Sequence, residues 1–287
     1  MSVRPKKRLG QHFLADAAVV QAIAEAVRAP AGSHVVEIGA GEGVLTAELL
    51  RRYPDLTAVE VDPEAIAHLR TRFPRLDLRE ADVLAVDWGA VRKEFGEEFG
   101  EPSPETVADL EVSTNSKLQT PNSSPLTVVG NLPYYITSPI LFGLLDAREH
   151  VGRAVVMVQK EVADRLVAPH GSKTYGTLSV YFQLYARVEA LFDVPRSAFR
   201  PPPNVESTVV AVDFQAEAPD VPLAAVQRVV RAAFGQRRKM FRNSVAPVFA
   251  DAGRALPAWA ETLRPEAVPP EGFVRLAQAL EGRRQEA

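Results

Sequence analysis

Apolar positions in the first half of the chain follow two alternating patterns. Short apolar runs, typical of strands buried on both faces, lie at 34–38, 56–60, 76–79, 126–130 and 154–159. Apolar residues at helical spacing predict helices at 15–27, 45–53, 63–73 and 139–147. Strands that alternate with helices pair in parallel, because each helix carries the chain back across one face of the sheet. The pattern therefore predicts an α/β fold with a doubly wound, Rossmann-like sheet.

The second half of the chain changes pattern. Helical spacing at 161–167 and 177–186 precedes apolar stretches at 187–194 and 207–214, which predict two late strands, arranged as a hairpin, around a Pro-rich segment at 195–204. Beyond 215 only helical spacing remains, at 223–234, 237–249 and 271–283. The sequence therefore predicts a sheet domain over 1–214 and a small C-terminal all-α domain over 215–287.

Residues 93–125 interrupt this alternation. The segment is rich in Glu, Ser, Thr, Asn, Pro and Gly and has almost no apolar periodicity, which predicts a mobile surface insertion between the third and fourth strands. Seven acids and no Lys or Arg lie between Glu94 and Glu111, although the whole chain has a formal net charge of only −3. Without those seven charges, the rest of the chain carries +4.

Positive charge gathers in two clusters that contain no acid. The first lies in the N-terminal arm, 1–14, and comprises Arg4, Lys6, Lys7 and Arg8. The second comprises Arg228, Arg231, Arg237, Arg238, Lys239 and Arg242. Two such clusters favour a polyanionic partner such as nucleic acid, with two solvated surfaces as the alternative. Phe234 and Phe241 interleave with the second cluster, where they serve either as contacts to a partner or as core residues.

Composition narrows the function classes. Hydrophobic residues make up 46% and charged residues 24% of the chain, as in ordinary globular proteins. No apolar run approaches the roughly 18 residues that span a bilayer, and no apolar segment follows the basic N-terminus as in a secretory signal. The absence of cysteine excludes disulfides, thiolate metal sites and cysteine nucleophiles, and the five histidines show no metal-ligand spacing. We therefore expect a cytoplasmic protein that needs neither a metal nor a membrane.

The most informative motif is Asn131-Leu132-Pro133-Tyr134-Tyr135, directly after the strand at 126–130. In open α/β sheets, ligands bind at the carboxyl ends of the strands. The Asn131 side-chain oxygen and the Leu132 carbonyl, beside the rigid Pro133, can each accept one N–H of an exocyclic amine on a flat base. The Tyr134 ring can stack on that base. The alternative is an ordinary turn, in which Asn and Pro serve the backbone.

Glycines and acids mark the ends of the other strands. Gly39, Gly41 and Gly43 follow the first strand and allow close approach of a ligand, but position 44, where the dinucleotide fingerprint needs a third spaced glycine, is Val. Glu60 ends the second strand, where a carboxylate can accept protons from both ribose hydroxyls. Asp82 follows the third strand and suits an adenine amino group. Each acid alone could be a helix cap or a solvated strand end, but together they favour a cofactor that carries a nucleoside.

These residues resemble a known enzyme family. The motif Glu37-x-Gly39-x-Gly41-x-Gly43, with Glu60, Asp82 and Asn131-Leu132-Pro133-Tyr134, resembles the S-adenosylmethionine-dependent N6-adenine methyltransferases. The rRNA adenine dimethyltransferases are a closer match, through Gln11-His12-Phe13-Leu14, residues 194–205 and Phe234-x-x-Arg237-Arg238-Lys239. The resemblance spans the chain except for 93–125. His12 stands where that family usually has Asn, and Tyr135 where Asn is frequent.

The resemblance implies a class I methyltransferase fold, S-adenosylmethionine as cofactor, and RNA as substrate. Among branches of the family, the small-subunit type fits best, which implies dimethylation of two adjacent adenines near the 3′ end of 16S rRNA, within a 30S precursor, by a monomer. It implies cofactor contacts at His12, Leu14, Gly39, Gly41, Glu60, Asp82 and Asn131. Catalysis then falls to Asn131, Leu132, Pro133 and Tyr134, and RNA binding to Arg237, Arg238, Lys239 and Arg242.

Three alternatives remain open at this point. A 23S rRNA dimethylase of the macrolide-resistance type shares the sheet and the Asn131 motif, although the signature after Phe234 and the basic arm favour the small-subunit type. A ribosome-assembly or transcription factor could use the same scaffold, but intact Glu60, Asp82 and Asn131 argue against lost catalysis. A small-molecule methyltransferase is disfavoured by the basic clusters.

Overall fold

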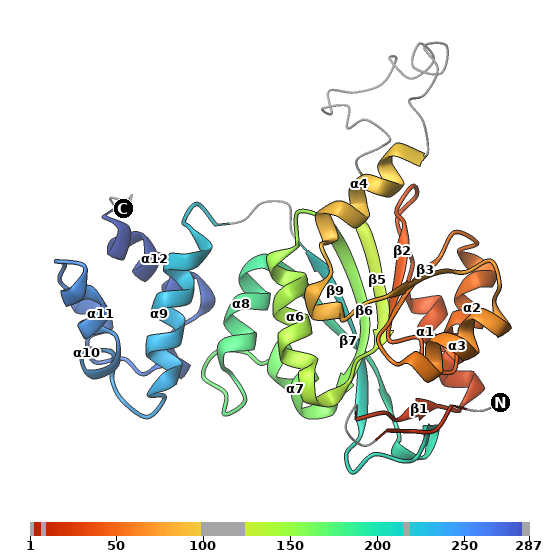
Figure 1. Cartoon of the computed structure of the whole chain (residues 1–287). Coiled ribbons are helices and arrows are strands. Elements are labelled where there is room, and N and C mark those ends of the chain that lie inside the picture. Colours follow the sequence, from red (N-terminus) through yellow and green to blue (C-terminus); the bar gives the residue numbers. More distant parts are fainter. Residues whose placement is uncertain (1–2, 7–9, 99–123, 215–218, 283–287) are drawn as a thin grey trace, which may run out of the picture. The chain divides into compact units, whose positions relative to one another are not determined.

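The computed structural model describes residues 3–6, 10–98, 124–214 and 219–282, and a mixed seven-stranded sheet forms the centre of this part of the chain (Figure 1). The strands are β2 (Val35–Ile38), β3 (Thr57–Glu60), β4 (Asp77–Glu80), β5 (Leu126–Asn131), β6 (Val151–Gln159), β7 (Ala186–Val194) and β9 (Ser207–Phe214). Their order is β4-β3-β2-β5-β6-β9-β7. The first five pair in parallel, as predicted, whereas β9 runs antiparallel to β6 and lies beside β7.

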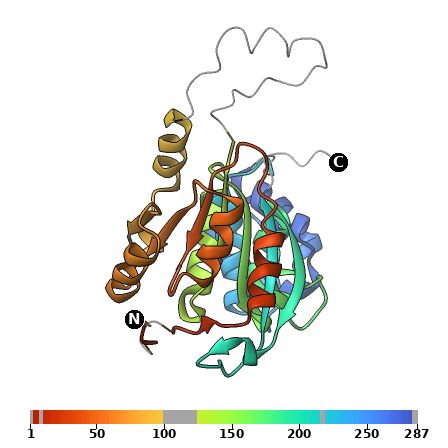
Figure 2. The same cartoon turned by 90° about the vertical axis from the view of Figure 1, so that its right-hand side faces the viewer.

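Helices cover both faces of this sheet, which confirms the predicted doubly wound α/β architecture. The helices α1 (Ala17–Ala26), α2 (Val44–Arg52) and α3 (Pro63–Arg72) lie on one face, and Figure 2 shows them in front of the sheet. The other face carries α4 (Trp88–Glu98) and α6 (Thr137–Asp146) (Figure 1). Asp16 caps α1 by accepting hydrogen bonds from two backbone N–H groups, and Asp62 caps α3, where Pro63 occupies the first turn.

The parallel register brings the ends of the central strands to one edge of the sheet. Ile38 at the end of β2 pairs with Val59 of β3 and with Gly130 of β5. Glu60 and Asn131, one residue further along their strands, therefore reach the same edge. Only glycine fits at position 130, because the Cβ atom of any other residue would lie 2.5 Å from the Ile38 carbonyl oxygen. This edge is where the predicted site residues converge.

A second, two-stranded sheet lies near this edge. It pairs β1 (Phe13–Leu14) antiparallel with β8 (Phe199–Arg200), so a segment of the N-terminal arm is tied to the predicted Pro-rich segment. Strands of two residues carry no periodicity, and the sequence gives no sign of this pairing. Leu14 and Phe199 then contribute to the main core under α1 and α2.

Helix α4 extends into the segment that was predicted to be an irregular insertion. Residues 93–98 belong to α4, so the expectation of an irregular segment from residue 93 is wrong for its first six positions. Trp88, Val91 and Phe95 lie at helical spacing, and the Phe95 ring stacks on His34, which explains why the helix continues. Residues 99–123 lie outside the described part of the chain.

The chain divides into two compact units, and the division differs from the predicted boundary at 214/215. Unit 1 comprises Met1–Gln159 with Leu191–Ala216, and unit 2 comprises Lys160–Ala190 with Glu217–Ala287. Unit 2 therefore includes α7 (Lys160–Leu166) and α8 (Thr177–Tyr185) beside α9 (Leu223–Gly235) and α12 (Pro270–Glu281). Tyr175 accounts for this grouping, because its hydroxyl donates to the Val268 carbonyl and its ring meets Phe234 edge-on.

The helix predicted at 237–249 is wrong. The structure has two short helices there, α10 (Phe241–Ser244) and α11 (Ala246–Asp251), and Met240 is extended with ψ 155°. Pro247 lies in the first turn of α11, where a missing N–H is tolerated; inside a longer helix it would break the hydrogen-bond ladder. Arg237, Arg238 and Lys239 therefore lie in the turn between α9 and α10 rather than on a helix.

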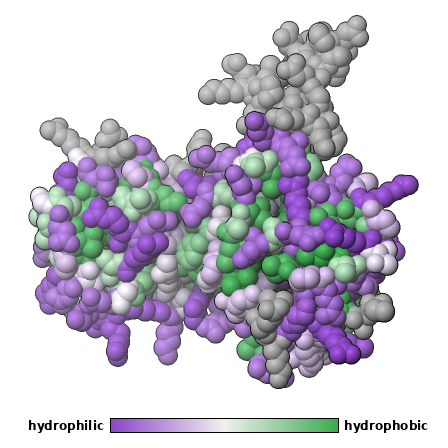
Figure 3. Space-filling model, in the orientation of Figure 1, coloured by the Kyte–Doolittle hydropathy of each residue, from purple (hydrophilic) through white to green (hydrophobic). Residues whose placement is uncertain are grey.

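Surface hydropathy is mixed. In unit 1, apolar side chains reach the surface among hydrophilic ones (Figure 3). The large apolar residues most exposed there are Val61, Leu84 and Tyr135, at 51%, 48% and 57%. Among the described residues, none of the helices combines the length and apolar character needed to cross a bilayer, and no group of three or more His, Cys, Asp or Glu side chains could hold a metal ion.

Candidate functional site

A cavity of about 310 Å³ opens at the carboxyl edge of the sheet. The predicted residues that line it are His12, Gly39, Gly41, Glu60, Asp82, Asn131, Leu132, Pro133 and Tyr134. Leu14 is buried and lines a smaller neighbouring cavity together with Gly39, Gly41 and Asn131. The structure thus brings together residues that are far apart in the sequence; Asn131 and His12, for example, are 119 positions apart and in contact.

The glycine turn after β2 forms one wall of the cavity. Gly39 and Gly41 have φ angles of 69° and 55°, in the left-handed region that side chains avoid. A Cβ on Gly41 would also meet the Phe13 ring at 3.0 Å. Both glycines are therefore required by the backbone, and the turn leaves space that a side chain would fill.

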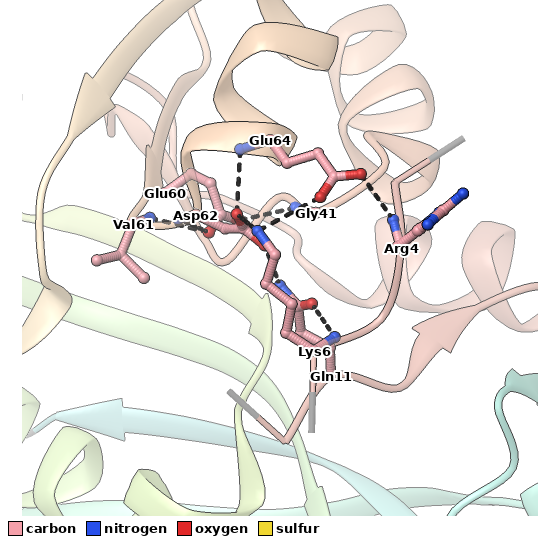
Figure 4. A network of polar contacts seen from close by, with 8 residues as sticks. All are labelled: Arg4, Lys6, Gln11, Gly41, Glu60, Val61, Asp62 and Glu64. Carbon is pink, nitrogen blue, oxygen red and sulfur yellow. Dashed lines mark hydrogen bonds and ion pairs between the residues drawn. The ribbon is translucent and has the colours of Figure 1, made fainter. Parts of the chain in front are cut away.

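Glu60 is held rigidly beside this turn. Its Oε2 accepts from the Gly41 N–H at 2.9 Å, and its Oε1 accepts from the Val61 and Asp62 N–H groups at 2.8 and 2.9 Å (Figure 4). Glu60 is only 5% exposed, so these backbone donors compensate for the burial of its carboxylate. A carboxylate has about four acceptor positions, so acceptor capacity remains for a ligand's hydroxyl.

Asp82 and two apolar side chains shape the far side of the cavity. Asp82 Oδ1 accepts from the Leu84 N–H at 3.0 Å and caps a short 3₁₀ turn, Val83–Ala85, so the helix-cap interpretation is correct for one of its oxygens. Val61 and Leu84, each directly beyond or near a strand-end acid, line the same cavity while about half exposed. They offer apolar walls for a flat ring. The sequence signal for them, an apolar residue one or two positions after each acid, is too weak to single them out.

Asn131 has one fixed amide orientation. Its Nδ2 lies 3.0 Å from the carbonyl oxygen of His12. A carbonyl only accepts hydrogen bonds, so this amide atom must be the nitrogen. Oδ1 accepts no hydrogen bond from any described residue. Leu132 continues the sheet, since its N–H donates to the Met157 carbonyl at 3.1 Å.

The carbonyls of Leu132 and Pro133 differ in their partners. The Pro133 carbonyl accepts from Thr137 Oγ1 at 3.0 Å and from the Ile136 N–H at 3.2 Å. The Leu132 carbonyl accepts no hydrogen bond from any described residue. Two acceptors of the motif, Asn131 Oδ1 and the Leu132 carbonyl, therefore have no donor among the described residues, and both residues line the cavity. The third acceptor, the Pro133 carbonyl, is occupied.

Tyr134 is fixed at both ends of its side chain. Its hydroxyl shares a 2.6 Å hydrogen bond with Ser207 Oγ at the start of β9, and its ring stacks on His12 with a centroid distance of 5.7 Å. Burial raises the pKa of the Tyr134 hydroxyl, so the side chain is neutral. Tyr135 differs, because its exposed ring lies at the cavity mouth close to Gly10.

His12 supports the site through both its ring and its backbone. Its Nδ1 lies 2.8 Å from the Pro201 carbonyl, which can only accept, so Nδ1 carries a proton and donates it. Its ring stacks on Tyr134, and its carbonyl orients Asn131. His12 was expected at the site, but the role of its carbonyl oxygen carries no signal in the sequence.

Glu37 lies beneath the glycine turn rather than in the main cavity. It is 1% exposed and lines the smaller cavity, and Thr46 Oγ1 donates to its Oε2 at 2.6 Å. Burial raises its pKa to about 8; the Thr46 hydrogen bond opposes this rise and the Glu60 charge adds to it. Glu37 therefore stays protonated at neutral pH.

The basic clusters do not act as units. Lys6 forms ion pairs with Asp62 and Glu64, so its charge is neutralised within unit 1, and Lys7 and Arg8 lie outside the described residues. Arg237 is half-buried and donates to the Ser172 and Lys173 carbonyls. Arg238, Lys239 and Arg242 are exposed. Of the predicted RNA-binding residues, three thus face solvent and Arg237 braces unit 2.

The interleaved aromatic residues belong to the core of unit 2. Phe273 is fully buried and contacts Phe234 at a centroid distance of 5.7 Å and Phe241 at 6.0 Å. Phe241 is also fully buried. These contacts decide between the two roles that the sequence left open for Phe234 and Phe241, because rings packed in this way are not presented to a partner.

Proteins of similar structure and sequence are known. The overall fold is similar to a dimethyladenosine transferase from Plasmodium falciparum, with a TM-score of 0.69 and 21% identity over 92% of this chain and 96% of that one. It is also similar to the 23S rRNA methyltransferase ErmE, with a TM-score of 0.58 and 25% identity over 94% and 99% of the two chains. These neighbours confirm the predicted class I methyltransferase fold.

Sequence similarity is stronger. A protein named ribosomal RNA small subunit methyltransferase A from Salinibacter ruber is 41% identical over 97% of this chain and 86% of its own length. A protein of the same name from Xanthomonas campestris is 42% identical over 96% of each chain. The pattern that defines the family of ribosomal RNA adenine dimethylases matches residues 3–262. With that match extending across both compact units, the chain belongs to the ribosomal RNA adenine dimethylase family.

Proposed function

We propose that this protein transfers methyl groups from S-adenosylmethionine to the N6 atoms of two adjacent adenines near the 3′ end of 16S rRNA. The observation that carries the proposal is the pair of acceptors formed by Asn131 Oδ1 and the Leu132 carbonyl. An adenine amino group has two N–H bonds, and this pair can hold both. The small-subunit name of the two relatives quoted above supports 16S over 23S rRNA.

The cavity fits the proposed cofactor. The left-handed Gly39 and Gly41 leave room for close approach of a ligand, Glu60 presents a fixed carboxylate to ribose hydroxyls, and Asp82 presents an acceptor to the adenine amine. Val61 and Leu84 supply the apolar walls between which the ring would lie. When bound, S-adenosylmethionine supplies the electrophilic methyl carbon.

The chain's own contribution is to position the amine. The N6 lone pair of adenine is delocalised into the ring, which makes the nitrogen a weak nucleophile. Two acceptors on the N–H bonds favour a pyramidal nitrogen and aim its lone pair at the methyl carbon. Positioning of this kind accounts for a large share of enzymatic rate enhancement. No general base is needed, because N6 becomes acidic as it gains the methyl group.

Tyr134 stabilises the extruded base. An adenine must leave its stack to reach this cavity, and a stacked aromatic ring returns about 1–3 kcal/mol per base. The Ser207 hydrogen bond holds the Tyr134 ring in one orientation before the base arrives. The exposed Arg238, Lys239 and Arg242 would contact RNA phosphates of the 30S precursor.

Methylation assays on defined substrates test this proposal. Small-subunit particles and naked 16S rRNA from cells that lack the modification are incubated with the protein and labelled S-adenosylmethionine, with 23S rRNA as control. We expect label in two adjacent adenines near the 3′ end of 16S rRNA and none in 23S rRNA. Labelling of 23S rRNA alone would support the macrolide-resistance type instead.

A further inference from the structure

Asp62 anchors the N-terminal arm across the carboxyl edge of the sheet (Figure 4). Its side chain is 0% exposed and accepts hydrogen bonds from three different groups. Lys6 Nζ and the Glu64 N–H donate to Oδ1, and Gln11 Nε2 donates to Oδ2 at 3.0 Å. Lys6 and Gln11 flank residues 7–9, which lie outside the described part of the chain. Asp62 therefore fixes both sides of that stretch.

Helix capping alone does not explain this arrangement. An N-cap residue needs one acceptor oxygen, and at Asp62 the bond to the Glu64 N–H fulfils that need. The second oxygen and the negative charge serve the arm instead. Burial raises the pKa of Asp62, but the hydrogen bonds from Lys6 and Gln11 outweigh it and hold that pKa below its usual value. Asp62 is thus charged where the arm meets it.

The arm transmits this anchor to the site. Gln11 Oε1 accepts from the Lys6 N–H at 2.9 Å, so the Gln11 amide is engaged at both ends. The next residue, His12, presents the carbonyl that orients Asn131. On its other side, His12 is held by the Pro201 carbonyl through Nδ1. The position of that single carbonyl therefore depends on Gln11 and, through it, on Asp62.

The same aspartate also adjoins the proposed cofactor side. Its backbone N–H donates to Glu60 Oε1, the carboxylate that the proposed function assigns to ribose. Asp62 thus contacts both the residue proposed to bind the cofactor and the N-terminal arm: its backbone N–H holds Glu60, and its side chain holds Lys6 and Gln11. No other described residue donates to Glu60 and accepts from the arm.

We infer that Asp62 is a positioning residue for methyl transfer, which acts through Lys6 and Gln11 to hold the His12 carbonyl and thereby keeps Asn131 Oδ1 turned toward the amine. This inference rests on the proposed role of Asn131. Loss of the anchor would let the Asn131 amide rotate, so that its NH₂ group meets the adenine amino group as donor against donor. The chemical step would slow while the fold remained.

Substitutions of matched type test this inference. Asp62→Ser keeps a capping oxygen for the Glu64 N–H but removes the charge and the second acceptor. Gln11→Leu removes both hydrogen bonds of the Gln11 amide. Because Gln11 also lines the cavity, S-adenosylhomocysteine affinity separates a direct effect on the cofactor from loss of the positioning link. Asp16→Ser is the control, because Asp16 also caps a helix with one oxygen and touches neither the arm residues nor the cavity. Melting temperatures and S-adenosylhomocysteine affinity are measured for each variant, followed by kcat and KM for 16S rRNA.

We expect Asp62→Ser and Gln11→Leu each to lower kcat about tenfold, with rRNA KM within about twofold and melting temperatures close to that of Asp16→Ser. The double variant should lose little more than either single one, because both remove the same link. If both single variants keep the wild-type kcat while Asn131→Ala is inactive, the inference about Asp62 is overturned and the proposed role of Asn131 stands. Normal turnover by Asn131→Ala would instead overturn the proposed function of that residue. If Asp62→Ser does not fold, Gln11→Leu decides the outcome.

Discussion

The side-chain amide of Asn131 donates to the carbonyl oxygen of His12, 119 positions earlier in the chain, at 3.0 Å. This contact gives the amide a single orientation and frees Oδ1 for a ligand. It also makes the geometry of the motif after β5 depend on a segment near the N-terminus.

Substitutions of Asn131 test its two amide atoms separately: Oδ1, which is proposed to hold the amine, and Nδ2, which donates to the His12 carbonyl. Asn131→Ala removes Oδ1 and should lower kcat by about a hundredfold or more, because one of the two positions that hold the amine is lost. Asn131→Asp retains an acceptor but turns an oxygen toward the His12 carbonyl, so it should also be strongly impaired. Transfer of labelled methyl to unmodified 16S rRNA measures both, and circular dichroism confirms folding. A near-normal rate for Asn131→Ala would contradict the mechanism.

Tyr134 has a ring and a hydroxyl with separable roles. Tyr134→Phe and Ser207→Ala each remove the hydrogen bond that fixes the ring, and each should lower kcat/KM several-fold. Tyr134→Ala also removes the stacking surface, worth about 1–3 kcal/mol, so kcat/KM should fall roughly tenfold to a hundredfold. Single-turnover assays on 16S rRNA fragments distinguish the two. Equal loss in Tyr134→Phe and Tyr134→Ala would show that stacking contributes nothing.

Glu37 should make stability fall as pH rises. Burial raises its folded-state pKa to about 8 from an ordinary value near 4.5, so the native state keeps a proton that the unfolded chain releases. The contribution to stability is full below pH 4.5 and is lost progressively up to pH 8, at about 1.4 kcal/mol per pH unit.

Urea unfolding across this range compares the wild type with Glu37→Gln. The substituted side chain cannot ionise, so the free energy of unfolding of the variant, relative to that of the wild type, should increase from pH 5 to pH 8. Glu25→Gln, which alters an exposed acid on α1, is the matched control and should follow the wild type. Parallel curves for wild type and Glu37→Gln would disprove a buried, protonated Glu37.

The exposed basic residues of unit 2 should govern RNA affinity. Arg238→Ala, Lys239→Ala and Arg242→Ala, combined, should weaken binding and reduce the slope of log affinity against log salt by about two to three charges. Arg237→Ala should lower the melting temperature instead, because it removes hydrogen bonds to the Ser172 and Lys173 carbonyls. Filter binding over a salt series measures the slope, which the triple variant must change if these residues meet phosphates.

Local features were predictable because their signals are local. Five strand-like runs and the helices between them determine the parallel part of the sheet, and the register of such a sheet places strand-end residues at one edge. Glu60, Asp82 and Asn131 were therefore found from the sequence. The glycine turn was also recognisable, because positive φ angles strongly favour glycine and so leave a visible Gly-rich pattern in the sequence.

Long-range contacts were not predictable. The His12 carbonyl has the same chemistry as every other carbonyl in the chain, so only the fold reveals that it meets Asn131. The pairing of Lys6 with Asp62 likewise depends on where the arm crosses the sheet, which converts a residue of an apparent RNA-binding cluster into an internal anchor. The prediction of a helix at 237–249 was wrong for a different reason: the apolar spacing continues across the whole segment, whereas Pro247 prevents one helix from running through it.

The pairing of β1 with β8 has a consequence for synthesis of the protein. His12 reaches Pro201 across 189 positions, and Phe13 pairs with Arg200 in the same place. A chain emerging from the ribosome therefore completes its parallel strands β2 to β6 long before the partners of its arm exist. A chain that ends before residue 199 can therefore pair β2 to β6 and still lack the contacts that hold His12 at the cavity.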